Sequence, residues 1–425
     1  MELKKYKLGE ILDVTRGASL SGEFYAAKGE YVRLTCGNFD YQNNCFKENK
    51  AKDNLYYIGD FKPDFLMKEG DIITPLTEQA IGLLGSTAII PESGKYIQSQ
   101  DVAKIVCKEH LLDKDFAFYL ISSNLVKQQL SAAAQQTKIR HTSPDKIKDC
   151  IVWIPELEEQ KRIGKLLRTI DLKIELNRQL NHNLEAMAKQ LYDYWFVQFD
   201  FPDENGKPYK SSGGKMVWDK RLKREIPLLW KAKMVEEVAD VYNGATPSTV
   251  NELNYGGDIV WITPKDLSDQ KQKFVYQGER NISQVGYDSC STHLLPSNTI
   301  LMSSRAPIGL LAIAKTELCT NQGFKSFVSK SKNIATYLYY YLQYHITQIE
   351  QLGTGTTFKE VSREDILKFP MLKPSDNVLD LWEEIVSALN DRQLEIQKEN
   401  ENLIKQRDEL LPLLMNGQVS VNYDL

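Results

Sequence analysis

The sequence predicts an α+β protein made of two repeated β-rich domains, separated by two long antiparallel helices that form a coiled coil. Three observations support this fold class: an internal repeat, short runs of β-branched and aromatic residues in each copy, and a long heptad pattern at the end of each copy. The 425 residues are also too many for one ordinary domain. The expected segments are a first domain at 1–155, a central helix at 156–199, a linker at 200–226, a second domain at 227–375 and a C-terminal helix at 376–425.

The internal repeat has an offset that runs from 219 residues (137 to 356) to 228 residues (32 to 260). Its clearest match is the segment Ile81-Gly82-Leu83-Leu84, which recurs unchanged as Ile308-Gly309-Leu310-Leu311. The other matches join 11–18 to 238–245, 32–35 to 260–263, and positions 137, 139, 140, 143, 147 and 155 to 356, 358, 359, 362, 366 and 374. Each match is weak alone, but their common order indicates two copies of one unit.

Each copy opens with a β-rich domain. Short apolar runs between Gly, Pro and Asn turns predict strands at 31–35, 85–90 and 102–107, and again at 258–262, 310–314 and 324–328. An aromatic helix is expected at 116–125 in the first copy and at 334–343 in the second. A short helix then begins in each copy, because Ser143 before Pro144 is typical of an N-cap and first helical residue, and Ser362 with Asp365 forms a capping pair.

Each copy closes with a long helix whose seam residues recur every seventh position, which favours a coiled coil. In the first helix they are Ile163, Ile170, Asn177, Leu184 and Leu191, flanked by Leu166, Leu180, Met187 and Tyr194; in the second they are Trp382, Leu389, Ile396, Leu403 and Leu410. An amphipathic helix lying on its own domain is the alternative, but about 38 residues make a helix about 55 Å long, longer than a small domain is wide. Asn177 and Lys173 could fix the register or contact a third helix. Residues 200–226 are rich in Pro, Gly, Ser and Lys, which predicts a linker.

The motifs of several enzyme classes are absent from the sequence. It contains no NPPF or DPPY motif for a flipped base, no GxxxxGK[ST] phosphate loop, and no HExxH or GxSxG motif. The six cysteines are scattered without a CxxC pair, which favours reduced thiols over disulfides or a zinc site. No apolar run reaches the roughly 18–20 residues of a membrane span, and the N-terminus lacks a signal-peptide core. We therefore expect a non-catalytic, cytoplasmic protein without a metal site.

The formal net charge of −4 is distributed unevenly. Residues 1–155 carry 20 basic and 20 acidic side chains, residues 156–226 carry 14 and 12, residues 227–375 carry 15 and 14, and residues 376–425 carry 4 and 11. The last 50 residues thus supply −7 and the rest of the chain +3. A DNA-binding protein could keep neutral to basic recognition surfaces and present an acidic helix to a protein partner. A solvated acidic helix is the alternative, and charge alone does not decide between them.

Polar loops at equivalent places of the two copies form the candidate binding surface. They lie at 136–143 and 353–360, at 74–79 and 303–307, and at 98–100 and 320–325. Hydroxyl, amide, Arg and Lys side chains contact the phosphates and base edges of DNA, with Arg or Lys favoured on guanine and Asn or Gln on adenine. Solvated turns are the alternative, but recurrence in both copies favours DNA contact. The candidate DNA-binding residues are Gln79, Gln100, Thr137, Lys138, Arg140 and His141 in the first copy and Arg305, Gln322, Lys325, Thr356, Thr357 and Lys359 in the second.

The helical segments carry a resemblance to a known family. The run 171–181, continued by 184–188 to Trp195 and Phe196, resembles the central region of the specificity subunits of Type I restriction–modification systems. The stretch 406–419 resembles their distal region, and 304–309 and 354–359 resemble recurring pieces of their recognition domains. The first copy departs from this pattern, because Thr77-Glu78-Gln79-Ala80 stands where the second copy has Ser304-Arg305-Ala306-Pro307. A role for Arg305 therefore does not carry over to Glu78.

The resemblance implies that each β-rich domain is a target-recognition domain that reads one half of a bipartite, asymmetric site on double-stranded DNA, while the helices set the gap. It also implies that the helices dock two methyltransferase subunits, which recruit restriction and translocase subunits. The candidate partner-binding residues are Leu184, Met187, Leu191, Leu403 and Leu410. S-adenosylmethionine, ATP and Mg would belong to these partners, and no cofactor is expected in this chain. Two alternatives stay open: a related restriction system whose partner fuses methylation and cleavage, and a coiled-coil protein-interaction scaffold without a DNA role.

Overall fold

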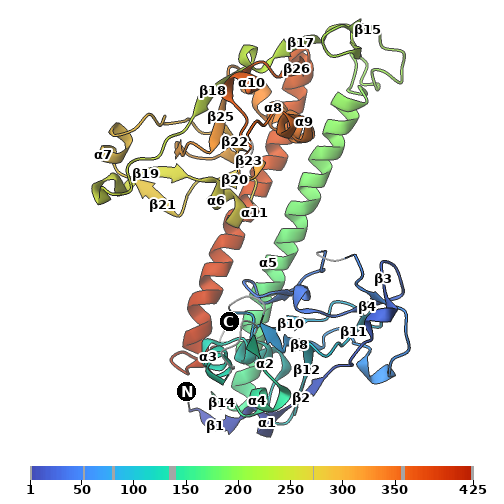
Figure 1. Ribbon diagram of the computed structural model, residues 1–425, viewed down its shortest axis with the longest axis vertical. Coiled ribbons are helices and arrows are strands. Elements are labelled where there is room, and N and C mark those ends of the chain that lie inside the picture. The colour runs from blue at the N-terminus through green and yellow to red at the C-terminus, as the bar shows by residue number, and fades with distance from the viewer. Residues whose placement is uncertain are drawn as a thin grey trace. The chain divides into compact units, whose positions relative to one another are not determined.

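The computed structural model describes residues 2–50, 53–78, 82–133, 140–270, 272–355 and 359–422 (Figure 1). The chain forms two compact units: unit 1 comprises Met1–Leu176 and Asn400–Leu425, and unit 2 comprises Asn177–Glu399. Two long helices, α5 (Leu157–Tyr192) and α11 (Asp376–Met415), each run from one unit into the other. Each unit therefore contains one β-rich domain together with a stretch of both helices.

The main sheet of unit 1 is antiparallel and has the strand order β10, β8, β12, β2. Its strands are β2 (Leu12–Arg16), β8 (Ile72–Pro75), β10 (Ala88–Ile89) and β12 (Val102–Cys107). Every residue of β8 is buried, and two adjacent residues of this strand, Ile72 and Ile73, belong to two different apolar clusters. Successive side chains of a strand point to opposite faces of the sheet, so this sheet has apolar packing on both faces.

Shorter strands complete the domain of unit 1. A second sheet has the order β11, β4, β7, β3, in which β4 (Tyr31–Arg33) and β11 (Tyr96–Ile97) are parallel. Its other strands are β3 (Tyr25–Ala26) and β7 (Tyr56–Tyr57), and three further pairs join β1 (Lys4–Lys7) to β14 (Ile151–Ile154), β5 (Phe39–Asp40) to β6 (Cys45–Phe46) and β9 (Thr77–Glu78) to β13 (Arg140–His141). The pairing of β9 with β13 brings together two of the predicted polar loops.

Unit 2 repeats this arrangement. Its main sheet has the order β18, β25, β22, β23, β20, and its second sheet the order β21, β19, β24, with β19 and β24 parallel. The strands are β18 (Ala239–Asn243), β19 (Tyr255–Ile262), β20 (Phe274–Val275), β21 (Arg280–Ile282), β22 (Ile300–Ser304), β23 (Ile308–Ala314), β24 (Cys319–Thr320) and β25 (Phe324–Ser329), with β17 (Lys231–Met234) paired to β26 (Pro370–Lys373).

The strand register is the same in the two copies. Val14 of β2 lies opposite Ile105 of β12, and Val241 of β18 lies opposite Phe327 of β25. The sequence repeat matches Val14 to Val241, so the pairing partners of matched residues also correspond. Register fixes which side chains face the core. The predicted internal repeat is therefore present in the backbone as well as in the sequence.

The aromatic helix expected at 116–125 is interrupted, whereas the one expected at 334–343 is a single helix, α8 (Ala335–Tyr344). In unit 1, α2 (Lys114–Ile121) ends before α3 (Asn124–Ala133), and the hydroxyls of Ser122 and Ser123 donate to the carbonyl oxygens of residues in α2. Such side-chain bonds to the backbone compete with helix continuation. In unit 2, α8 is followed after one residue by α9 (Ile346–Gln351), beyond the expected range. The remaining short helices are α1 (Leu8–Ile11), α4 (Pro144–Lys148), α6 (Pro264–Gln270), α7 (Gln284–Asp288) and α10 (Arg363–Leu367).

The two predicted helix caps are present. Ser143 Oγ accepts a hydrogen bond from the backbone N–H of Lys146 at the start of α4, and Pro144 is the first residue of that helix. Ser362 Oγ accepts from the backbone N–H of Asp365 at the start of α10. Each cap satisfies an N–H group that the first helical turn leaves without a partner.

The segment predicted to be a linker, 200–226, is folded. It contains the hairpin of β15 (Met216–Asp219) and β16 (Arg224–Pro227), and Phe201 and Ile226 are buried in the core of unit 2. The carboxylate of Asp200 accepts hydrogen bonds from both the hydroxyl and the backbone N–H of Ser211. The polar composition concealed these few apolar anchors, which are enough to attach the segment to unit 2.

The buried face of α5 differs from the predicted seam at the flanking residues, which lie one position further along the helix than expected. The predicted flanking residues Leu180, Met187 and Tyr194 are exposed, whereas Leu167, Ala188 and Trp195 are buried. The second seam residue thus lies four positions after the first rather than three. Both spacings lie on one face of an α-helix. Packing against the β-rich domains favours the spacing of four positions, because Leu167 joins the core of unit 1 and Trp195 joins that of unit 2.

Polar side chains occupy much of the buried face of α11. They are Asn390, Gln393, Gln397, Asn400 and Arg407, whereas the predicted seam residues Leu389, Leu403 and Leu410 are only half-buried. Several of these polar groups have hydrogen-bond partners on the facing helix or on the β-rich domain of their unit, which lowers the cost of their burial. Asn181 Nδ2 donates to the carbonyl oxygen of Gln393 in unit 2 (3.3 Å), and Asn400 Nδ2 donates to that of Ile174 in unit 1 (3.4 Å). Asn181 and Asn400 are 219 positions apart, as are Ile174 and Gln393, so one contact occurs in both units.

Asn177 lies within the seam, as its predicted role in register requires. It is almost fully buried, and its Nδ2 donates to Glu399 Oε2 at 2.7 Å within unit 2. A buried amide that is hydrogen-bonded across a helix seam favours a single alignment of the two helices. Lys173, the other predicted register residue, is exposed.

A buried tyrosine connects the domain of unit 1 to both helix stretches. Tyr119 of α2 donates its hydroxyl to Asp171 Oδ2 of α5 at 2.5 Å, and Arg407 Nη1 of α11 donates to Asp171 Oδ1 at 2.9 Å. Burial, followed by the charge of Asp171, holds the pKa of Tyr119 well above its usual value. The tyrosine therefore stays a neutral hydrogen-bond donor.

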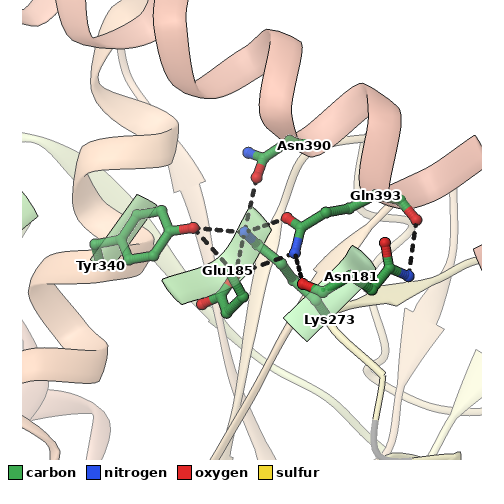
Figure 2. A network of polar contacts seen from close by, with 6 residues as sticks. All are labelled: Asn181, Glu185, Lys273, Tyr340, Asn390 and Gln393. Atoms are coloured by element: carbon green, nitrogen blue, oxygen red, sulfur yellow. Dashed lines mark hydrogen bonds and ion pairs between the residues drawn. The ribbon is translucent and has the colours of Figure 1, made fainter. Parts of the chain in front are cut away.

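A buried lysine lies between the domain of unit 2 and its helix stretches. Figure 2 shows Lys273 Nζ among four oxygen acceptors: Glu185 of α5 (2.8 Å), Tyr340 of α8 (2.6 Å), and Asn390 (2.7 Å) and Gln393 (3.1 Å) of α11. Burial lowers the pKa of Lys273 to about 8, although the carboxylate of Glu185 opposes that shift. The lysine thus attaches the second domain to stretches of both helices.

Candidate nucleic-acid interface

In unit 2, the ends of β22 and β25 meet the loop that precedes α10. Ser304 at the end of β22 is followed by Arg305, which forms an antiparallel bridge with Glu360. The carboxylate of Glu360 lies 3.9 Å from Arg305 Nη1 and 3.3 Å from Lys325 Nζ, and accepts a hydrogen bond from Ser304 Oγ at 3.4 Å. One carboxylate thus organises two cations that come from separate strands.

In unit 1, the equivalent loops are joined by β9 and β13. Arg140 lies opposite Glu78 and His141 opposite Thr77 in this pair of strands. Arg140 Nη1 lies 3.6 Å from Glu78 Oε2, while Glu78 Oε1 accepts from the backbone N–H of Gly82 at 2.8 Å. The Thr77 hydroxyl lies within hydrogen-bond distance of His141 Nδ1, at 3.4 Å. Here too a carboxylate and a guanidinium group meet where two loops pair.

The exposure of these charges differs between the two units. In unit 1 the carboxylate of Glu78 is buried, at 4% exposure, and Arg140 is 40% exposed. In unit 2 the buried charge is the ammonium group of Lys325, at 6%, whereas Arg305 is 38% exposed. Each unit therefore fixes one charged group inside the fold and leaves a guanidinium group accessible at its surface.

The third pair of loops is held close to the main sheet by glycines. A side chain at Gly17 would meet the carbonyl oxygens of Gln98 and Ser99 at 2.3 Å, and one at Gly244 would meet those of Thr320 and Asn321 at 2.2 Å. Both distances are too short for a Cβ atom, so only glycine permits this approach. The exposed candidates Gln100 and Gln322 follow these loops, and Gln322 accepts a hydrogen bond from the hydroxyl of Thr246.

The structure brings part of the predicted DNA-binding set together. Arg140 and His141 lie beside Glu78, Arg305 lies beside Glu360, and Gln100, Gln322 and Lys359 are exposed on loops of their own units. Lys325 is buried against Glu360 instead, so its ammonium group acts inside the fold in this conformation. Five predicted residues lie outside the described part of the chain: Gln79, Thr137, Lys138, Thr356 and Thr357.

Sequence reasoning missed the carboxylates Glu78 and Glu360 as members of these clusters. A signal was available, since the offset of 227 matches Glu78 to Arg305, and the offset of 219 matches His141 to Glu360. When matched positions of the two copies carry opposite charges, the side chain in one copy needs a different ionic partner from the side chain in the other copy. Their significance emerges only when the facing strands are known.

The predicted partner-binding residues have different environments. Met187 is exposed, and Leu184 and Leu403 are half-buried. Leu191 packs against the core of unit 2, and Leu410 against that of unit 1. Exposed apolar side chains that sequence reasoning did not assign to a partner are Leu172 and Leu176 in unit 1 and Leu180 in unit 2.

The two units share one fold, and each carries a polar and charged loop junction. Among the described residues, no group of three or more His, Cys, Asp and Glu side chains is placed to hold a metal ion. In the described part of the chain, no helix has both the length and the apolarity that crossing a membrane requires.

The chain belongs to the family described as the Type I restriction modification DNA specificity domain, whose sequence model matches residues 1–186 and 227–406. Specificity subunits of this family are non-catalytic, and the predicted family and fold class are thus confirmed.

Individual relatives agree with this assignment. The chain is 24% identical to the Type I restriction enzyme HindI specificity subunit of Haemophilus influenzae over 98% of this chain and 99% of that protein. It is 35% identical to the MjaIX specificity subunit of Methanocaldococcus jannaschii, over 45% of this chain and 46% of that protein. The crystal structure of a Type I restriction–modification S subunit from M. genitalium has the same fold, with a TM-score of 0.65 and 16% identity over 98% of this chain and 96% of that one.

Proposed function

We propose that this chain is the DNA sequence-recognition subunit of a Type I restriction–modification complex, and that each β-rich domain reads one half of a bipartite, asymmetric site. The observation that carries the proposal is the double family match, since each match spans one β-rich domain and most of the long helix that follows it. The two domains share their strand register but differ in the side chains at their loop junctions. Equal scaffolds with unequal loops would read two different base sequences.

The chemistry of the loop junctions suits DNA. Arg140, Arg305 and Lys359 offer cationic donors at the surface, and Gln100 and Gln322 offer amides. Guanidinium and ammonium groups bind phosphate oxygens or the O6 and N7 atoms of guanine, and amides bind adenine. The surrounding acidic groups are engaged with these cations in the fold. Because the domains are close to neutral in sequence, base contacts would contribute a larger share of the affinity than a general electrostatic attraction.

The long helices would dock two methyltransferase subunits, which in turn recruit restriction and translocase subunits in the cytoplasm. Exposed apolar side chains on α5, including Met187 and Leu180, support this role, because such residues on a helix favour burial by another protein. Leu184 would add to the docking surface of unit 2 and Leu403 to that of unit 1, while Leu191 and Leu410 pack against the cores of their own units. S-adenosylmethionine, ATP and Mg would be bound by the partners and not by this chain.

The test is sequencing of DNA methylation in a host that lacks other methyltransferases and expresses this chain with its methyltransferase partner. We expect adenine methylation at one motif with two specific halves and an unspecific spacer. Exchange of residues 1–155 for the corresponding domain of a relative should change one half of that motif and leave the other half intact. The matched control exchanges residues 227–375 and should change the other half. Absence of any methylated motif, with the two proteins co-purifying, would refute the recognition role. A motif altered in both halves by either exchange would refute the division between the domains.

A further inference from the structure

A cavity of about 220 Å³ lies in unit 2 beside the hairpin of β15 and β16. The hairpin belongs to the folded segment 200–226, which lies between the two family matches and outside both of them. From its turn and from β16 it contributes Arg221, Leu222 and Arg224 to the cavity. The facing walls come from the end of α5 and from helices α8 and α9. The cavity therefore depends on a segment that unit 1 does not contain.

The cavity is positively charged. Arg221 and Arg224 line it, and none of the other described residues that line it is acidic. Arg224 is half-buried, and its guanidinium group lies over the ring of Phe199 at 4.7 Å. Asp219, at the start of the same turn, accepts hydrogen bonds from the backbone N–H groups of Arg221 and Leu222. A half-buried guanidinium group that faces no carboxylate in its cavity stabilises an anion that enters there.

The other groups of the cavity are uncharged at neutral pH. His345 Nδ1 lies 2.9 Å from the carbonyl oxygen of Tyr341, and burial lowers the pKa of His345. Burial raises the pKa values of Tyr192, Tyr337 and Tyr341 well above their usual range. The rings of these tyrosines and of Phe196 are buried and give the cavity largely apolar walls. The two arginines alone therefore set its charge.

The size and the walls of the cavity favour a protein side chain or chain terminus as its occupant. Pockets for cofactors usually measure about 300–1,000 Å³, whereas this one measures about 220 Å³. The backbone of a duplex presents its phosphates in a row, which calls for a row of exposed cations and not for a recess between aromatic rings. A carboxylate that is flanked by apolar groups matches both the charge and the walls.

We propose that this cavity receives a carboxylate of the methyltransferase partner, bound by the guanidinium groups of Arg221 and Arg224. This inference rests on the proposed function, in which the long helices dock that partner. Tyr192, the last residue of α5, places the cavity at the end of one of these helices. The carboxylate belongs to an acidic side chain or to a chain terminus of the partner. It would add a directional, charged contact to the apolar side chains of α5, because guanidinium groups bind carboxylates through paired hydrogen bonds.

The first experiment measures docking of the purified methyltransferase on the full chain by surface plasmon resonance. Arg224→Gln should weaken docking by about tenfold or more, as expected for a hydrogen bond between charged groups, and Arg221→Gln by about threefold or more. Gln348→Glu introduces a carboxylate at an exposed position of the cavity wall and should also weaken docking by about tenfold, with an unchanged melting temperature. The matched controls are Lys220→Gln and Lys223→Gln, which remove exposed cations of the same turn that do not line the cavity. Each control should stay within about twofold of the wild type.

The second experiment identifies the occupant. The side chain of Tyr344 lines the cavity and is 50% exposed, so Tyr344→p-benzoylphenylalanine places a photo-crosslinker at its entrance. Illumination of the complex with the methyltransferase and a duplex, followed by mass spectrometry, should yield a methyltransferase peptide that contains Asp, Glu or the chain terminus. Neutralising that carboxylate should weaken docking on the wild-type chain and add little to the loss caused by Arg224→Gln.

Three results would overturn the inference. The first is wild-type-like docking of both Arg224→Gln and Gln348→Glu. The second is an equal loss in Lys220→Gln and Lys223→Gln, which would indicate a general electrostatic attraction. The third is a crosslink to the duplex, or to a peptide without a carboxylate. Failure of the proposed function is distinct, because the wild-type chain itself would then not dock the methyltransferase.

Discussion

Replacement of Lys273 by Met should strongly destabilise unit 2. The change removes the ammonium group from the cluster in Figure 2 and leaves the carboxylate of Glu185 and the amide oxygens of Asn390 and Gln393 without their shared donor. Met has a similar length and is apolar, so the packing of the side-chain stem changes little. The effect of the variant therefore reports on the lost charge.

The magnitude follows from the burial of the pair. The side chain of Lys273 is 10% exposed and that of Glu185 is 22% exposed. Removal of one partner from a buried ion pair costs about 3–5 kcal/mol, because the other charge remains buried without compensation. In a unit of this size, 1 kcal/mol shifts the melting temperature by about 2–4 °C, so we expect a decrease of about 6–20 °C. The double variant K273M/E185M should recover most of this loss, because it leaves no uncompensated charge.

Tryptophan fluorescence is the suitable assay. Five of the six tryptophans belong to unit 2, namely Trp195, Trp218, Trp230, Trp261 and Trp382, whereas Trp153 belongs to unit 1. Thermal unfolding followed by this signal therefore reports mainly on the unit that carries the substitution.

Lys265→Met is the matched control. This lysine forms a surface ion pair with Glu279, and because solvent screens such a pair its loss should leave the melting temperature almost unchanged. A stabilising role of the buried ion pair would be contradicted if Lys273→Met melted within about 2 °C of the wild type, or if K273M/E185M were no more stable than K273M.

Three further predictions concern pH, docking and spacing. The folded-state pKa of Lys273 is lowered to about 8 from an ordinary value of 10.5, so the unfolded chain binds more protons between these values. The unfolding free energy of the wild type relative to Lys273→Met should then be flat below about pH 8 and rise toward pH 10, as urea titrations at each pH can measure. Met187→Glu should weaken methyltransferase docking by about tenfold or more in surface plasmon resonance, since a buried Met contributes about 1.5–3 kcal/mol, while the melting temperature of the isolated chain stays unchanged. Insertion of seven residues after both Leu176 in α5 and Glu399 in α11 should lengthen each helix by about 10.5 Å, which corresponds to about three base pairs. Methylation sequencing should then find a longer spacer between unchanged half-sites.

The strands and caps could be predicted from sequence because their signals are local. The run 102–107 is β12 (Val102–Cys107), and Ser143 and Ser362 cap their helices as expected. Alternating apolar residues and the reach of a serine hydroxyl depend on a few neighbouring positions. The internal repeat reinforced these signals, since each element was present twice.

The helix seam could be predicted only in part. Leucines at seven-residue spacing pointed to Leu403 and Leu410, but Asn400 and Arg407 are more deeply buried. Sequence patterns treat asparagine and arginine as surface residues, whereas here the carbonyl oxygen of Ile174 and the carboxylate of Asp171 make their burial favourable. Such partners lie more than 200 positions away and leave no periodic signal.

The loop junctions show the same limit. Arg140 and Arg305 were candidates from residue type and repeat position, but their carboxylate partners were not. The partner of Arg305 is Glu360 of the facing loop, and the residue types of the two loops do not show which of their residues face one another. The burial of Lys325 depends likewise on Glu360 from a loop 35 positions away.

The two buried clusters have a consequence for folding fidelity. Tandem domains with one fold risk misassembly, because each can pack on the helix surface that belongs to the other. Asp171 and Asn390 are matched positions, yet the first meets Arg407 and Tyr119 and the second meets Lys273. A second domain that packed beside Asp171 would bring Lys273 close to Arg407, and a first domain packed beside Asn390 would leave Glu185 without a cation. A buried charge without a partner costs about 3 kcal/mol, which disfavours the wrong arrangement more than a hundredfold. The buried polar residues therefore prevent each domain from packing on the helix surface of the other.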